Sequence, residues 1–454
     1  MRRREVLTGL GGLGVLGALG VLGVLAGCIS PAPASVKPAS SLSPYEPAFF
    51  YAFPLYEMAR TAQTRAGPLG GQLNRVGHRA TLADHTSRQI TAPNNDTVYS
   101  SAQLELLGGP VEIFSPSDAK RYFSIALMDA FTDNFAYIGT RATKGAGGRF
   151  WVVGPQWAGT APAGVEVLRS STNDAWMLGR ILVEGPDDLP AAAALQQQIK
   201  VTPTFAAPAR CFSVPATRLE DPANFLGVVN DMLARSPGGK GQTARAARFA
   251  SIGIGAAAGA VSPDVFAAWR DFIPVGLTRL REKFLFRDLT VNGWGYQPKG
   301  VGNFGTDDFL RASVALGGLA ALGEEEAMYF QAMRDGANAP LSGDHAYRWR
   351  VPAGGVPADA FRSLTMYQAE PDGRFFLVEN PIRRFSVGDR TPGLVKNADG
   401  STDILIQRNA PTGPAGANWL PAPAGEMRLS LRAYLPRKVL RDRTWRFPPI
   451  ERIA

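Results

Sequence analysis

Polar side chains that could bind or activate a small molecule gather at turns in two stretches of the chain. The first stretch contributes amide, carboxylate, phenol and guanidinium groups from Asn95, Asp96, Tyr99, Asp129, Asn134 and Arg141. The second contributes two guanidinium groups, an amide and an indole from Arg384, Arg390, Asn418 and Trp419. A carboxylate can act as a general base, and a planar guanidinium suits the oxygens of a carboxylate or phosphate.

Three interpretations fit these residues. In the one we favour, they bind a polar or anionic ligand or partner. In the second, Asp96 or Asp129 is the general base of a hydrolase or lyase, and Arg141 or Arg390 holds an anionic or carbonyl oxygen. In the third, Asp and Asn satisfy the backbone of their own turns and a buried Arg–Asp pair joins two loops.

The sequence lacks the motifs of several well-known classes of enzyme and metal site. It contains no G-x-S-x-G nucleophile elbow and no Walker A loop. The histidines His78, His85 and His345 do not have zinc-site spacing. A G-x-G-x-x-G match at residues 12–17 follows no strand, so we treat it as accidental. We therefore predict neither a metal nor a cofactor.

Short apolar runs separated by turn residues surround both groups of polar side chains. Such runs recur between residues 98 and 183 and again between residues 359 and 434, at intervals of about ten residues, which is typical of antiparallel sheets. They predict a β-sandwich or open barrel in the first region and a jelly-roll-like unit in the second.

The chain between the two β regions, residues 187–340, has the pattern of helices. Asp221 followed by Pro222, and Ser262 followed by Pro263, are helix-start signals. Residues 241–257, 262–284 and 306–334 are each predicted as helix, as are residues 48–66 near the start of the chain.

The N-terminus has the features of an export signal. Arg3-Arg4 resembles the twin-arginine signal, although a general secretory signal also carries arginines, and an apolar, Gly-rich segment follows from Leu10 to Ala26. Leu25-Ala26-Gly27-Cys28 resembles a lipobox, in which the thiol of Cys28 takes a diacylglycerol. The alternative is an uncleaved anchor helix. Residues 29–47 are rich in Pro, Ser and Ala and predict a tether.

The net charge and the cysteine content limit which binding partners we predict. The formal net charge of +9 fits an anionic surface or simply a solvated one, and no Lys/Arg block is dense enough to predict nucleic-acid binding. Once Cys28 is lipidated, Cys211 has no intramolecular partner. The predicted partners are a membrane through the lipid anchor and a small polar or anionic ligand; a homo-oligomer remains an open alternative.

Several motifs resemble a known pair of bacterial domains. Residues 95–100, 127–129, 139–141 and 176–180 resemble the domain-of-unknown-function 1254 family. Residues 363–367, 379–381, 388–394 and 418–423 resemble its usual companion, domain-of-unknown-function 1214. The resemblance covers nearly all of residues 48–450 and implies two β-rich domains joined by helices. It implies no particular reaction.

The sequence thus predicts an α+β protein with two antiparallel β-sandwich or jelly-roll-like domains joined by a helical segment. The predicted parts are a signal peptide (1–27), a lipidated tether (28–47), an N-terminal β-rich domain (48–186), a helical segment (187–340) and a C-terminal jelly-roll-like domain (341–454). The predicted location is the cell envelope.

Overall fold

The computed structural model describes residues 44–67, 72–255, 259–283, 289–370 and 373–453. Contacts divide the chain into a unit Met1–Ser41 and a unit Leu42–Ala454, and all of the described residues belong to the second. The predicted signal peptide, Cys28 and nearly all of the tether lie outside the described residues. Within the described ranges, no helix is both long enough and apolar enough to cross a membrane.

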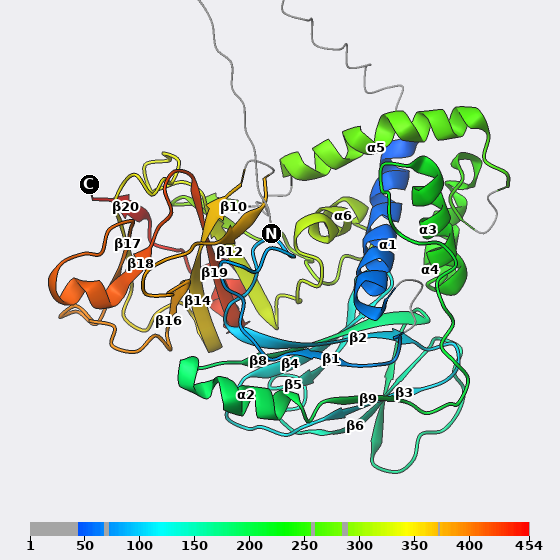
Figure 1. Ribbon diagram of the computed structural model, residues 1–454, viewed down its shortest axis with the longest axis horizontal. Helices are drawn as coiled ribbons and strands as arrows, with labels where there is room; N and C mark the ends of the chain where they lie inside the picture. Colours follow the sequence, from blue (N-terminus) through cyan, green and yellow to red (C-terminus); the bar gives the residue numbers. More distant parts are fainter. Residues whose placement is uncertain (1–43, 68–71, 256–258, 284–288, 371–372, 454) are drawn as a thin grey trace, which may run out of the picture. The chain divides into compact units, whose positions relative to one another are not determined.

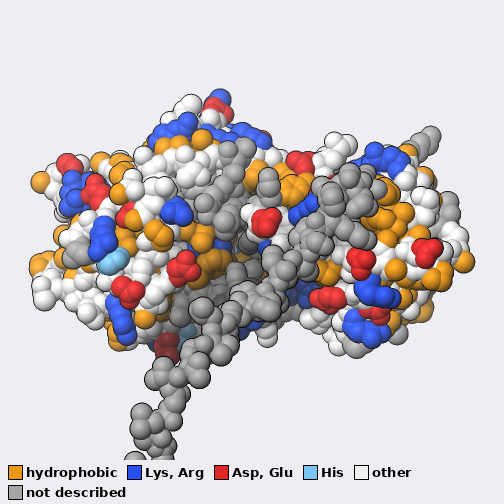
Figure 2. Space-filling view, turned by 90° about the horizontal axis from the view of Figure 1, so that it is seen from above, with side chains coloured by type: hydrophobic (Ala, Val, Ile, Leu, Met, Phe, Trp, Pro, Cys, Tyr) orange, Lys and Arg blue, Asp and Glu red, His pale blue; other side chains and the backbone are white. Residues whose placement is uncertain are grey.

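The predicted α+β class is confirmed, with 25% helix, 29% strand and antiparallel sheets in two β-rich regions separated by helices (Figure 1). On the face seen in Figure 2, basic and acidic side chains are interspersed outside the grey atoms. The positive net charge is therefore not gathered into a single patch on that face.

The first β region is a sandwich of two sheets. The five-stranded sheet has the order β1-β2-β8-β4-β5 and the four-stranded sheet the order β7-β6-β3-β9. Their strands are β1 (Gly77–Arg79), β2 (Thr97–Glu105), β3 (Val111–Ser115), β4 (Phe123–Asp129), β5 (Asn134–Gly139), β6 (Gly148–Val153), β7 (Val165–Arg169), β8 (Asp174–Leu182) and β9 (Lys200–Pro203). Alternate apolar residues of both sheets, among them Ile125, Met177 and Val152, form one shared core.

The second β region is also built from two sheets around one core. One sheet has the order β10-β11-β12-β19-β14-β15, with β16 paired to β14, and the other has the order β18-β17-β13-β20. Their strands are β10 (Leu289–Val291), β11 (Trp294–Tyr296), β12 (Ala327–Ala332), β13 (Tyr347–Val351), β14 (Ala358–Ala369), β15 (Phe375–Leu377), β16 (Ser386–Gly388), β17 (Thr402–Gln407), β18 (Trp419–Pro421), β19 (Met427–Pro436) and β20 (Ile450–Arg452). Phe330, Leu431 and Trp349 meet in this core.

Helices form a third core beside the first sandwich. The helical elements are α1 (Tyr45–Ala66), η3 (Pro186–Asp188), α2 (Leu189–Gln196), α3 (Pro222–Arg235), α4 (Gly239–Ala247), η4 (Ala250–Ile252), α5 (Pro263–Lys283), α6 (Asp308–Gly317), η5 (Gly413–Asn418) and α7 (Lys438–Arg441). α1 packs on α3, α5, α6 and strand β2 (Figure 1). Asp221 caps α3 as predicted, because its side chain accepts a hydrogen bond from Ala223 N.

The structure corrects the predicted bounds of the domains. The helix predicted over 306–334 ends at Gly317, and residues 327–332 are the interior strand β12. Met328 and Phe330 alternate into the sandwich core there, so sheet pairing overrides the helical pattern. β9, beyond the predicted boundary at 186, joins the first sandwich, whereas α1 joins the helical core.

Candidate functional site

Two central strands carry arginines on the face that turns away from their own sandwich core. On β8, Met177 and Ile181 point into the first core, so Arg180 lies on the opposite face with Leu178. On β19, Leu429 and Leu431 enter the second core, and Arg428, Ser430, Arg432 and Tyr434 share the other face. Each sandwich therefore presents a partly polar outer face on its larger sheet.

These two outer faces meet, and we call their contact the junction. Tyr122, Ala126 and Leu182 of the first sandwich form an apolar cluster with Ala327, Phe361 and Tyr434 of the second. The Phe361 and Tyr434 rings stack with centroids 4.1 Å apart. Beside this apolar contact lie the charged and phenolic groups that could hold a ligand.

Arg180 is the cation at the centre of the junction. Its residue is 6% exposed and its guanidinium carbon lies 5.6 Å from the centroid of the Tyr99 ring. Nη2 donates to the carbonyl of Ala320 at 2.9 Å, but the buried Nη1 has no hydrogen-bond acceptor, and no carboxylate lies within ion-pair distance among the described residues. A buried guanidinium without a carboxylate is costly, which marks this position for a ligand.

Tyrosines surround Arg180. Burial alone lowers the pKa of Arg180, but the hydroxyls of Tyr99, Tyr329 and Tyr434 outweigh that effect and raise the pKa above its ordinary value. The Tyr434 hydroxyl accepts a hydrogen bond from Asn94 Nδ2 at 2.9 Å, whereas the hydroxyl of the partly exposed Tyr99 has no hydrogen-bond partner among the described residues. The Tyr99 hydroxyl is thus available to an incoming group.

Of the predicted residues, Asp96 and Arg390 come together at the junction. Asp96 Oδ1 accepts from Arg390 Nη2 at 2.9 Å, and the Arg390 guanidinium carbon lies 4.5 Å from the Phe361 ring centroid. Asp96 Oδ2 and Arg390 Nε are buried and have no hydrogen-bond partner in the described part of the chain. The pair joins the two sandwiches and retains one free carboxylate oxygen.

Asp129 is the last residue of β4, and both of its carboxylate oxygens accept hydrogen bonds. Its Oδ1 accepts from the backbone N–H groups of Phe131 and Asp133, at 2.9 and 3.0 Å, and its Oδ2 accepts from Ser171 Oγ at 2.5 Å. Burial, followed by the neighbouring Asp133, raises the pKa of Asp129 to about 6. Asn134, at the other end of the same turn, donates to the carbonyls of Gly302 and Ala321.

Arg141 binds across the junction rather than facing a ligand. Its Nε donates to Glu326 Oε2 at 2.6 Å, while Tyr122 donates to Glu326 Oε1 at 2.7 Å. Glu326 is buried, with 2% of its side chain exposed. The three side chains form a closed network immediately before β12.

The remaining predicted ligand-binding residues hold loops together. Asn95 bonds to the Ala83 carbonyl and to Ser386 Oγ. Arg384 donates to the carbonyls of Ala417 and Trp419, and the Trp419 indole donates to Gln407. Asn418 bonds to the backbone of Val395 and Asp403. Most of these contacts are to backbone groups, as in the third interpretation, but Asn95 also accepts a hydrogen bond from the Ser386 side chain, 291 positions away.

Family comparisons agree with this architecture. The family described as "Protein of unknown function (DUF1254)" matches residues 73–203, and the one described as "Protein of unknown function (DUF1214)" matches residues 326–438. The chain belongs to the two-domain DUF1254/DUF1214 family. The first match coincides with the first sandwich, and the second contains β12, β14 and β19 of the other. The resemblance drawn from the sequence motifs is therefore confirmed.

A solved structure from Vibrio parahaemolyticus has the same fold as this DUF1254/DUF1214 protein. The VPA0106 protein from Vibrio parahaemolyticus is 23% identical with a TM-score of 0.70, and the match covers 90% of this chain and 98% of that one. An uncharacterized protein from Burkholderia cenocepacia is 13% identical with a TM-score of 0.45, covering 89% and 87%. No curated protein matches the chain.

Sequence reasoning missed three buried arginines on the outer faces of the two larger sheets of this DUF1254/DUF1214 protein. Arg180, Arg428 and Arg432 were not among the predicted site residues. A signal was present, because each is a cation within a largely apolar strand, where charged residues are rarely buried. That signal alone could not show whether a carboxylate lies opposite.

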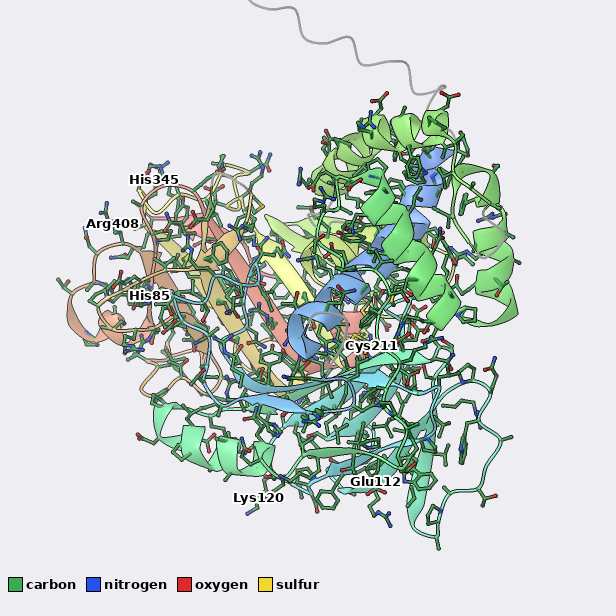
Figure 3. The ribbon with its side chains drawn as sticks, turned by 45° about the vertical axis from the view of Figure 1, so that its right-hand side comes forward. His85, Glu112, Lys120, Cys211, His345 and Arg408 are labelled. Atoms are coloured by element: carbon green, nitrogen blue, oxygen red, sulfur yellow. The ribbon has the colours of Figure 1, made fainter. Side chains whose placement is uncertain are left out.

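Metal-ligand side chains are dispersed. Among the described residues, no three His, Cys, Asp or Glu side chains gather closely enough to hold a metal ion. Figure 3 shows His85, His345 and Cys211 well apart from one another. His78 shares a 2.9 Å hydrogen bond with Ser100 Oγ, and burial lowers the pKa of this histidine.

Proposed function

We propose that this protein is an exported envelope lipoprotein that binds a small anionic ligand at the junction, with Arg180 as the anchor. The observation that carries the proposal is Arg180 itself. It is a buried cation with no carboxylate partner, a guanidinium nitrogen without an acceptor, and a phenol with an unused hydroxyl beside it. A carboxylate or phosphate supplies the missing acceptor and countercharge together.

A comparison with Arg390 supports the proposal that Arg180 anchors the ligand. Arg390 faces Asp96 at 2.9 Å, so its charge is balanced within the protein. Arg180 has the tyrosines and one backbone carbonyl instead, which are neutral groups. Burying an unpaired charge costs several kcal/mol, and a bound anion removes most of that cost.

The test is native mass spectrometry of the full-length protein, extracted gently from its envelope, for the wild type and for Arg180→Met. The wild type is expected to retain an anionic small molecule that the variant loses. Arg428→Met is the matched control, because Arg428 is 2% exposed, also lacks a carboxylate and packs 3.7 Å from the Phe375 ring centroid, on a different strand. Retention of the same molecule by Arg180→Met would overturn the proposal, as would an empty wild type that binds no added carboxylate or phosphate.

The envelope location rests on the N-terminal sequence. Cys28 follows Leu25-Ala26-Gly27 at the end of an apolar segment, in the arrangement of a lipobox. The same spectra, recorded under denaturing conditions, report whether a chain that begins at Cys28 carries a diacylglycerol. A full-length chain without lipid would contradict the lipoprotein assignment while leaving the ligand result intact.

The hydrolase or lyase alternative loses one of its two candidate bases. Both carboxylate oxygens of Asp129 are occupied, Oδ1 by the turn that follows it and Oδ2 by Ser171. Asp96 keeps one free oxygen, but it is buried and its other oxygen is bound to Arg390. No contact in the junction favours catalysis over binding.

A further inference from the structure

A row of side chains crosses the first sheet at Tyr99. In the antiparallel register, Arg79 of β1 lies opposite Tyr99 of β2, and Tyr99 lies opposite Arg180 of β8. Directly opposite residues of adjacent strands share a face, with Cβ atoms about 5 Å apart. Tyr99 is therefore flanked on one sheet face by two arginines.

A third arginine reaches the same place from helix α1. The Arg65 guanidinium carbon lies 5.4 Å from the centroid of the Trp176 ring, and the Trp176 indole donates to Ser101, two residues from Tyr99. Burial lowers the pKa of Arg65, an effect that the charge of Arg79 reinforces and Tyr99 partly offsets. Arg65 therefore interacts electrostatically with two members of the row, Tyr99 and Arg79.

None of these three arginines has a carboxylate within ion-pair distance among the described residues. Arg79 donates only to the neutral Ser87 hydroxyl, at 2.9 Å, and Arg180 only to a backbone carbonyl. Elsewhere on α1 the usual arrangement holds, because Arg60 is paired with Glu57. The surroundings of Tyr99 thus concentrate positive charge without an internal counter-ion.

We infer that the ligand is a dianion, such as a phosphomonoester or a small dicarboxylate, held between Arg180 and Arg65 with the Tyr99 hydroxyl as a further donor. This inference rests on the proposed function, because it assigns a position to the second negative charge of the ligand proposed to bind Arg180. Arg180 holds one acidic oxygen at the buried end of the site. Arg65, on the more exposed side, meets the remaining charge, and Arg79 adds to the local positive potential.

The experiment is isothermal titration of full-length wild-type protein in detergent at about pH 8, where phosphate is mainly a dianion. Inorganic phosphate and succinate are the dianionic probes and acetate is the monoanionic one. Dianions are expected to bind about tenfold more tightly than acetate, because they gain one additional charge-assisted contact. Arg65→Gln should remove that tenfold advantage and leave acetate affinity within about twofold.

Two further variants complete the test. Arg180→Gln should weaken acetate and both dianions alike, which reports the anchor itself. Arg60→Gln removes one positive charge from the same helix at a position already paired with Glu57, so it should leave all three affinities unchanged. If acetate binds through Arg180 but dianions gain nothing from Arg65, only the dianion inference fails. If no anion binds the wild type, the proposed function fails with it.

Discussion

Arginine side chains in this protein are either paired or surrounded by neutral groups, and burial alone does not decide which. Arg390 and Arg141 face carboxylates across the junction, whereas Arg180 faces phenols. At the level of single residues, Arg390 and Arg141 join the two sandwiches through carboxylates, whereas Arg180 has no carboxylate partner among the described residues. Asp129 is a buried acid, and its neighbours likewise decide whether it carries a charge.

Asp129 should make stability depend on pH. Its pKa is raised from 3.8 to about 6, so between these values the folded state holds a proton that the unfolded state releases. Stability should therefore fall as pH rises through this window, by about 2–3 kcal/mol, and level off above it. Asp129→Asn keeps the turn, because its oxygen accepts from Phe131 and Asp133 and its amide donates to Ser171. Urea unfolding at several pH values should show the fall in the wild type and not in the variant; parallel curves would contradict the assignment.

At the scale of elements, the close packing of helices α1 and α5 matters more than the helix propensity of the residue where they cross. Helix α5 crosses α1 where Gly276 meets Phe49, and a Cβ built on Gly276 would lie 2.6 Å from that ring. Phe49 is itself held by Phe225 and Phe272, so it has little freedom to move away. The glycine is therefore needed for the helix crossing, despite its cost inside a helix.

Gly276→Ala is expected to destabilise the protein by about 1–3 kcal/mol through overpacking, although alanine is the better helix former. Gly227→Ala in α3 is the matched control, because its Cβ would meet only Val214 at 3.4 Å. That substitution should be neutral or stabilise by up to about 1 kcal/mol. Thermal and urea unfolding of the two variants, compared with the wild type, separate the effect of overpacking at the helix crossing from the effect of helix propensity. Equal effects of the two substitutions would mean that the helix crossing tolerates a methyl group at Gly276.

For the unit Leu42–Ala454 as a whole, the junction makes two sandwiches behave as one folded body. Glu326 is its most buried acidic link, because Tyr122 and Arg141 of the first sandwich both bind it just before the strand β12 of the second. Tyr367 adds a link of another kind, since its hydroxyl donates to the Pro93 carbonyl at 2.7 Å. Loss of the Glu326 network should therefore destabilise both sandwiches.

Glu326→Ala is expected to lower the free energy of unfolding by about 3 kcal/mol, since it leaves Arg141 and Tyr122 without their shared acceptor. The neighbouring Glu325→Ala should cost less than about 0.5 kcal/mol, because the Glu325 side chain is 68% exposed. Urea unfolding, followed by tryptophan fluorescence and far-ultraviolet circular dichroism, measures both. Equal losses in the two variants would show that the junction does not depend on Glu326.

The sequence by itself determined the local features of this protein. Alternating apolar residues predicted most of the strands, Asp221 and Pro222 marked the start of α3, and the motifs indicated the DUF1254/DUF1214 family. These features depend on residues close together in the chain, so local pattern suffices to read them. The helix predicted through residues 327–332 was wrong because pairing with β11 and β19, a non-local interaction, decides that segment.

Only the tertiary structure decided which polar residues share a site. The period of two along β8 places Arg180 on the outer face, but it cannot show what covers that face. Asp96 and Arg390 are 294 positions apart, and they pair because the outer faces of two sheets meet. Asp129 has the same side chain as Asp96, yet the following turn occupies its Oδ1 and Ser171, 42 positions away, occupies its Oδ2. Whether a charged side chain is balanced by the protein or left for a ligand depends on distant neighbours, and folding alone brings those neighbours together.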